Sequence, residues 1–141
     1  YVSLVHAVDS LRLLQEINRQ ALRCGRVIPC LLELHIAQEE SKYGFTPEAC
    51  EAMLAAGEWK ALTGVEITGL MCMASNTDDE AQIRREFHLA HKLFLRYKSL
   101  YFADKEYFKE CSWGMSHDYP IAVEEGATLV RVGSYIFGER I

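Results

Sequence analysis

Short apolar runs rich in β-branched residues recur along the chain, and segments with helical periodicity separate them. The run at residues 67–74 is the clearest, because no charged side chain interrupts it, which is typical of a strand buried on both faces. We predict five strands, over residues 1–6, 27–36, 65–74, 110–115 and 128–132.

The segments between these runs carry the start and stop signals of helices. Asp9 or Ser10 can cap a helix, Pro47 suits the first turn of another, and Gly126 ends a short one. The first predicted helix covers residues 11–22 and has one apolar face, formed by Leu11, Leu14, Ile17, Ala21 and Leu22. Further helices are predicted over residues 47–56, from Asp78 or Asp79 to about Leu100, and over 118–125. A short helical run is predicted at 135–138.

Strands that alternate with helices predict an α/β fold with a parallel sheet, because consecutive parallel strands need a crossover. A doubly wound sheet and a (β/α)₈ barrel both fit this order, but a barrel needs eight strand–helix units and about five are present. Because the chain begins with a strand at Tyr1 and not with methionine, we expect a fragment whose three earlier strands lie upstream. Such an open sheet would favour self-association through its exposed edge.

Composition limits the partners and the compartment. The 141 residues, half of them apolar, suffice for one domain with a hydrophobic core. A formal net charge of −5 without any run of Lys or Arg argues against nucleic acid and acidic membranes as partners, and no apolar run reaches the length of a membrane span. The five cysteines form no C-x-x-C pair. A zinc site or a secreted disulfide framework is therefore not expected, and we predict a cytoplasmic protein.

Two strand ends late in the sequence carry small and hydroxyl-bearing residues suited to phosphate. Residues 112–118 pass from a strand into a helix start, where Gly114 permits an unusual backbone and Ser116 lies near the N-cap. Gly133 and Ser134 repeat this arrangement after the next strand. Such loops bind phosphate through backbone N–H groups, often after the last two strands of a barrel. We predict a phosphate site for a small-molecule ligand; ordinary capping and turn roles are the alternative.

Arg131 interrupts an apolar strand, and a guanidinium among apolar neighbours is costly unless it is paired. Inside a barrel it would lie beneath the phosphate-held ligand and face an aromatic nitrogen or a carboxylate; an ion pair with Glu33 is the alternative. His6, Met71 and Met115 are weaker pocket candidates, because a single histidine is as often structural and methionines often fill cores. Glu33 and His35 alternate on one strand face, but no third ligand at metal spacing accompanies them, so we predict no metal site.

Several motifs point to one family. The run EEGATLVRVGS at residues 124–134 is the most distinctive, and HAVDS at 6–10, IAQEESKYG at 36–44, GMS at 114–116 and IFGER at 136–140 accompany it. With these motifs the chain resembles, along its whole length, the pyridoxal phosphate homeostasis proteins, the YggS-like family with the alanine racemase N-terminal barrel fold.

The resemblance implies a single-domain TIM-type (β/α)₈ barrel that holds pyridoxal 5′-phosphate, with residues 1–141 as its C-terminal portion. It places the phosphate at the two loops above and Arg131 near the pyridine nitrogen. An arginine there disfavours protonation of the ring, which makes it a poor electron sink and suits carriage of the cofactor better than catalysis. The implied cofactor-binding residues are Met115, Ser116, Arg131, Gly133 and Ser134, with His6 and Met71 as further pocket residues.

The resemblance also implies a monomeric regulator of pyridoxal phosphate and amino-acid balance, without assigned catalytic residues. In the family the lysine that forms the Schiff base lies on the first barrel strand, upstream of the part that matches Tyr1, and none of the six lysines here stands in that motif. Two alternatives stay open: a racemase or decarboxylase of the same barrel class, and a barrel enzyme for another phosphorylated ligand such as a sugar phosphate.

Overall fold

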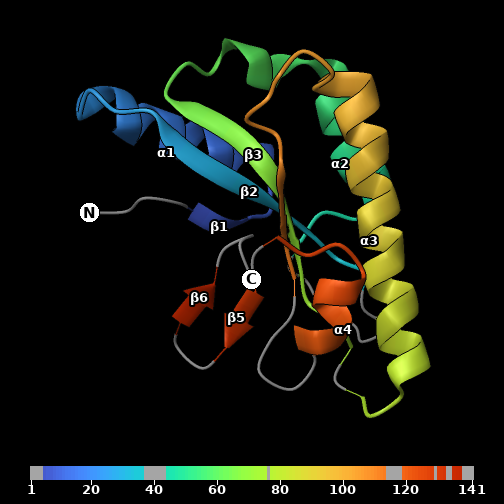
Figure 1. The fold of residues 1–141 in the computed structure, drawn as a ribbon. Helices are drawn as coiled ribbons and strands as arrows, with labels where there is room; N and C mark the ends of the chain where they lie inside the picture. The colour runs from blue at the N-terminus through green and yellow to red at the C-terminus, as the bar shows by residue number, and fades with distance from the viewer. Residues whose placement is uncertain are drawn as a thin grey trace.

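A computed structural model describes residues 5–36, 44–75, 77–113, 119–128, 130–132 and 135–137. Four of its strands form one parallel sheet in the order β1-β2-β3-β4 (Figure 1). A helix lies between each consecutive pair in the chain, which confirms the predicted α/β class. The strands are β1 (Val5–Val8), β2 (Ile28–Leu34), β3 (Val65–Cys72) and β4 (Glu110–Ser112).

Side-chain caps fix the starts of three helices. Ser10, Thr46 and Asp79 each accept a hydrogen bond from a backbone N–H of the first turn, and Pro47 takes the first helical position it suits. The longest helix contacts α2 and α4 (Figure 1). The helices are α1 (Leu11–Arg23), α2 (Pro47–Ala56), the 3-10 helix η1 (Glu58–Ala61), α3 (Glu80–Tyr101) and α4 (Tyr119–Glu124).

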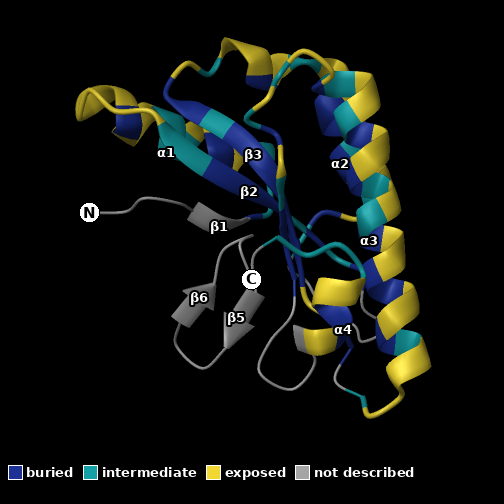
Figure 2. Ribbon diagram, viewed as in Figure 1, coloured by how far each residue is buried: buried dark blue, intermediate teal, exposed yellow. Residues whose placement is uncertain are grey.

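The hydrophobic core lies between the sheet and the helices, and the strand register defines it. Leu32, Leu70 and Cys111 occupy one row across β2, β3 and β4, and all three are buried in the main apolar cluster (Figure 2). Because successive side chains of a strand point to opposite faces, the neighbouring rows face away from this cluster. Gly69 of β3 lies in such a row. A Cβ there would clash with the carbonyl oxygen of Glu110 in β4, so the close approach of the two strands requires glycine at position 69.

Two sequence expectations about the end of the chain are wrong. Residues 135–137 form a strand, β6 (Tyr135–Phe137), and not a helical run. The fifth predicted strand exists as β5 (Val130–Val132), but its described partner is β6, in an antiparallel pair separate from the parallel sheet. Tyr, Ile and Phe are residue types that favour an extended backbone, and pairing with β5 gives hydrogen-bond partners to the N–H and C=O groups of β6 that face it.

The expectation for Leu22 is also wrong, because its side chain is 53% exposed while Leu14 and Ala21 are buried. Leu22 lies about 100° around the helix from Ala21, so it leaves the face that meets the sheet.

In the part of the chain that the structure describes, no helix combines the length and the apolar character needed to span a membrane.

Candidate functional site

The carboxyl ends of β2, β3 and β4 bring three side chains to one level of the sheet. Glu33 pairs with Met71, and Met71 pairs with Ser112. This row faces away from the helix-covered core, yet Met71 is only 2% and Ser112 only 1% exposed. In a (β/α)₈ barrel that face is the interior, and its carboxyl end holds the functional site. Met71 therefore stays a candidate pocket residue.

For two of the other predicted site residues the structure describes the backbone alone, and the rest lie outside the described residues. His6 belongs to β1 and Arg131 to β5, where Arg131 pairs with Ile136, but their side chains are outside the described part. The place of Arg131 near a pyridine nitrogen and its alternative ion pair with Glu33 both stay predictions. Also outside the described residues are Met115, Ser116, Gly133 and Ser134.

The flank that precedes residues 114–118 is fixed against α3. Trp113 is buried, with its ring stacked on Phe87 at a centroid distance of 6.4 Å and edge-on to His91 at 6.2 Å. Its indole Nε1 has no hydrogen-bond partner among the described residues. The chain therefore leaves β4 with a large aromatic anchor on α3 immediately before the predicted phosphate loop.

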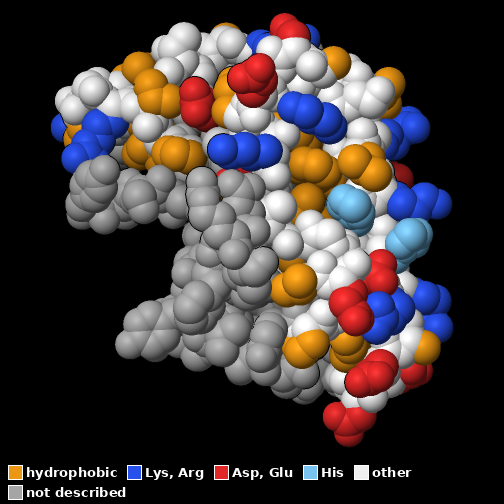
Figure 3. All heavy atoms as spheres, in the orientation of Figure 1, with side chains coloured by type: hydrophobic (Ala, Val, Ile, Leu, Met, Phe, Trp, Pro, Cys, Tyr) orange, Lys and Arg blue, Asp and Glu red, His pale blue; other side chains and the backbone are white. Residues whose placement is uncertain are grey.

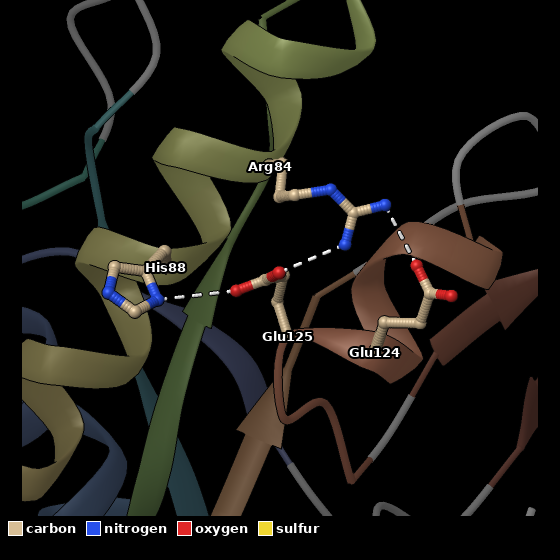
Figure 4. A network of polar contacts seen from close by, with 4 residues as sticks. All are labelled: Arg84, His88, Glu124 and Glu125. Carbon is tan, nitrogen blue, oxygen red and sulfur yellow. Dashed lines mark hydrogen bonds and ion pairs between the residues drawn. The ribbon is translucent and has the colours of Figure 1, made fainter.

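The flank that follows this loop is also fixed against α3, by polar contacts (Figure 4). Arg84 Nη2 donates to Glu124 Oε1 at 2.8 Å, and its Nη1 donates to Glu125 Oε2 at 3.0 Å. His88 Nδ1 lies 3.3 Å from Glu125 Oε1. Glu124 and Glu125 hold the pKa of Arg84 above its usual value through these hydrogen bonds. Because Glu124 ends α4, the network joins α3 to that short helix.

Behind α4 the chain returns to β4. Gly126 has φ +97°, and the ring of His91 lies 2.9 Å from the position a Cβ would take. Two residues later, Thr128 N donates to the carbonyl oxygen of Cys111 at 2.8 Å. Cys111 N in turn donates to Thr128 Oγ1 at 2.7 Å, and Thr128 Oγ1 donates to Glu110 Oε1 at 2.8 Å. The entry to β5 is thus fixed beside β4.

Sequence reasoning did not single out Glu86, which anchors the loop after β3. Its side chain is 4% exposed, and its two carboxylate oxygens accept from Ser75 N at 2.7 Å and Ser75 Oγ at 2.6 Å. Gln82 Nε2 also donates to it at 3.1 Å. Its position in the sequence could have indicated this role. Glu86 lies beside Phe87 on the apolar face of α3, and a buried carboxylate there needs hydrogen-bond donors.

Burial makes the thiols of Cys30 and Cys111 poor nucleophiles at neutral pH. Burial raises the pKa of Cys30 to about 12, and it also raises the pKa of Cys111 above its usual value, so both stay protonated. Of the five cysteines, only Cys24 is exposed. Within the described ranges, no group of three His, Cys, Asp or Glu side chains could hold a metal ion.

The alanine racemase N-terminal domain family matches residues 1–141. The chain belongs to this family. Among its curated relatives are proteins named pyridoxal phosphate homeostasis protein. The one from Helicobacter pylori J99 is 36% identical over 138 residues, which cover 97% of this chain and 58% of the relative. The one from Aquifex aeolicus is 33% identical over 140 residues, covering 99% and 59%. The one from Mus musculus is 31% identical over 153 residues, covering 99% and 51%.

Solved structures of the same family share the fold. PipY of Synechococcus elongatus without pyridoxal phosphate has a TM-score of 0.83 and 32% identity, over 94% of this chain and 60% of PipY. PipY with pyridoxal phosphate bound has a TM-score of 0.79 and 31% identity, over 94% of this chain and 59% of PipY. The four-stranded parallel sheet is therefore part of a TIM-barrel-like fold, and the chain spans between half and three fifths of the relatives it matches.

Proposed function

We propose that this chain is part of a single pyridoxal 5′-phosphate-binding barrel that acts in cofactor and amino-acid homeostasis as a carrier or regulator. The observation that carries the proposal is the similarity to PipY with pyridoxal phosphate bound, at 31% identity over 94% of this chain. Relatives from bacteria and mouse named pyridoxal phosphate homeostasis protein support the same role.

The residues of the described sheet suit such a ligand. A pyridine ring needs apolar cover, and Leu31 and Met71 are buried in the rows that face away from the helices. Ser112 adds a buried hydroxyl at the carboxyl end of β4. The phosphate would be held by Ser116, Gly133 and Ser134, with Met115 beside them, and the ring nitrogen would meet Arg131. Bound pyridoxal phosphate supplies an aldehyde that captures amines and a ring that withdraws electrons.

The proposal has further parts that concern the intact protein. We place it in the cytoplasm as a monomer, with pyridoxal phosphate as its partner and neither nucleic acid nor membrane. The net charge of −5 of this 141-residue chain agrees with that set of partners. We assign no catalytic residue, because the lysine of the family's Schiff base does not occur in its motif in this chain.

Borohydride trapping tests the proposal. The 141-residue chain and the full-length gene product are each incubated with pyridoxal 5′-phosphate, reduced, and analysed by intact mass, with pyridoxine 5′-phosphate, which lacks the aldehyde, as the control ligand. We expect an adduct on the full-length product alone. A stoichiometric adduct on the present chain would instead place the covalent lysine among its six, and no adduct on either would favour another phosphorylated ligand.

A further inference from the structure

The long helix α3 concentrates basic charge in an acidic chain. It carries five of the chain's 15 Lys and Arg residues, although the chain as a whole has a net charge of −5. The only acidic residues of the helix are Glu80, in its first turn, and Glu86, which is buried. Figure 3 shows basic and histidine side chains along the edge of the molecule that α3 forms, with hydrophobic side chains between them. The exposed side of this helix is therefore locally cationic.

A groove of about 480 Å³ lies on this side, between α3 and the end of α4. An adjoining hollow of about 340 Å³ shares Arg85 and Leu89 with it. Leu89 is 44% exposed. Because Arg85 precedes it by four residues and Lys92 follows it by three, the three side chains are neighbours on one face of the helix. The residues that line the groove include Arg84, Arg85, His88, Leu89, Lys92 and Glu125.

The charges in the groove do not cancel. Glu125 is already engaged, since its carboxylate oxygens lie 3.0 Å from Arg84 Nη1 and 3.3 Å from His88 Nδ1, and its side chain is only 16% exposed (Figure 4). Arg85 and Lys92 have no ion-pair partner among the described residues. The charge left without a partner in the groove is therefore positive, and it stands on either side of an exposed leucine.

An acidic peptide segment complements this face. Arg85 and Lys92 are seven residues apart, which is about 10 Å along the helix axis. Two carboxylates at the same spacing on a second helix would meet both cations and place an apolar side chain between them on Leu89, as amphipathic helices do in grooves. A nucleic-acid backbone fits less well, because Glu124, with a side chain 62% exposed, is bonded to Arg84 beside the groove and would repel a run of phosphates.

We propose that the face of α3 formed by Arg85, Leu89 and Lys92 docks an acidic amphipathic segment of a partner protein. The bonds from Arg84 to Glu124 and Glu125 hold the two helices that border the groove together before any partner binds. This surface does not depend on the proposed function, because it lies on the exposed side of a helix, whereas the pocket candidates of the sheet face away from the helices.

Fluorescence polarisation with the full-length gene product tests the proposal. The probe is a fluorescein-labelled helical peptide with glutamates seven residues apart and leucines between them, and the control peptide has serine in place of each leucine. We expect the wild type to bind the probe more tightly than the control peptide. The double variant Arg85→Glu with Lys92→Glu should weaken probe binding by about tenfold or more, and Leu89→Ser by about threefold.

A matched control separates the face from the overall charge. Arg12→Glu with Arg23→Glu reverses two exposed cations of α1, changes the net charge by the same amount, and should leave probe binding unchanged. Equal weakening by the two double variants would overturn the proposal, because the effect would then belong to net charge. If Arg85→Glu with Lys92→Glu does not fold by circular dichroism, Lys92→Glu alone and Leu89→Ser decide the question.

The remaining outcomes assign the face to something else. Failure of the wild type to bind the probe overturns the proposal. Binding instead to vesicles of phosphatidylcholine and phosphatidylserine in equal parts, lost in the double variant of α3, would assign the face to an anionic membrane surface. None of these measurements uses pyridoxal phosphate, so failure here leaves the proposed function standing.

Discussion

The two halves of α3 are joined to the rest of the molecule by different kinds of contact. Its C-terminal half leads into the amino end of β4 and packs through aromatic rings. Phe102 stacks on Phe108 with centroids 4.0 Å apart and planes at 1°, and Phe94 stacks on the same ring at 4.9 Å. Trp59 of η1 extends the cluster, 4.8 Å from Phe102. This end of the helix belongs to a continuous hydrophobic core.

The N-terminal half lies at the carboxyl ends of the strands and adds polar contacts that reach loops. Glu86 holds Ser75 after β3, and Arg84 holds the two glutamates at the end of α4. In (β/α)₈ barrels the carboxyl end of the strands carries function and the opposite end carries stability. One helix therefore serves both ends of the sheet, through aromatic packing at one end and polar contacts to loops at the other.

Removal of an aromatic ring should give the largest effect. Phe108 is fully buried and stacks on two rings, so we expect Phe108→Ala to lower the free energy of unfolding by about 3–5 kcal/mol. Urea unfolding measures this, with Phe108→Leu as the control that keeps most of the volume. If Phe108→Ala loses no more unfolding free energy than Phe108→Leu, the aromatic cluster does not stabilise the C-terminal end of α3.

Gly126 and Gly57 both have left-handed backbones but differ in their surroundings, so replacing each by alanine gives a matched test. Gly126→Ala must strain φ +97° and also press a Cβ against His91, so we expect it to destabilise by about 2–3 kcal/mol. Gly57→Ala at the end of α2 has φ +79° but meets nothing closer than Lys60 at 4.0 Å, so only backbone strain of about 1 kcal/mol should remain. Thermal unfolding of both variants gives the difference, and equal losses would contradict the steric role of His91.

Loss of the buried carboxylate of Glu86 should give the next largest loss of stability. Glu86→Ala leaves Ser75 N–H without the acceptor it has at 2.7 Å, so we expect a loss of about 1–2 kcal/mol and faster hydrogen exchange at the Ser75 amide. Arg85→Ala, an exposed neighbour on the same helix, should stay within about 0.5 kcal/mol of wild type. If exchange at Ser75 is unchanged in Glu86→Ala, the carboxylate does not anchor the loop after β3.

Much of the fold could be predicted because local signals and the global fold agree. The β3 run, the caps at Ser10 and Asp79, and Pro47 at a helix start each act within a few residues, so the sequence pattern contains them. β6 was mistaken for a helical run because three residues show no periodicity, and its partner β5 decides its backbone.

The contacts around the candidate site were harder to predict because they join distant residues. Arg84 and Glu125 are 41 positions apart, and surface arginines and glutamates are too common for a pattern to pair them. The burial of Trp113 against α3 likewise depends on how the helix crosses the sheet. The motifs near residues 114–118 and 133–134 did indicate a phosphate site from sequence alone, and those assignments stay predictions.

The smallest effect should appear in acid, at the ion pair beside α2. Hydrogen bonds from Arg96 hold the pKa of Glu51 below its usual 4.5. A carboxylate whose folded pKa is lowered stabilises the protein above its unfolded pKa, and this contribution is lost as the pH falls through the folded value. We therefore expect wild type to exceed Arg96→Gln in urea midpoint at pH 6, and the difference to vanish as the pH falls below 4.5. A difference that persists into strong acid would show that Arg96 acts through packing of its aliphatic stem and not through its charge.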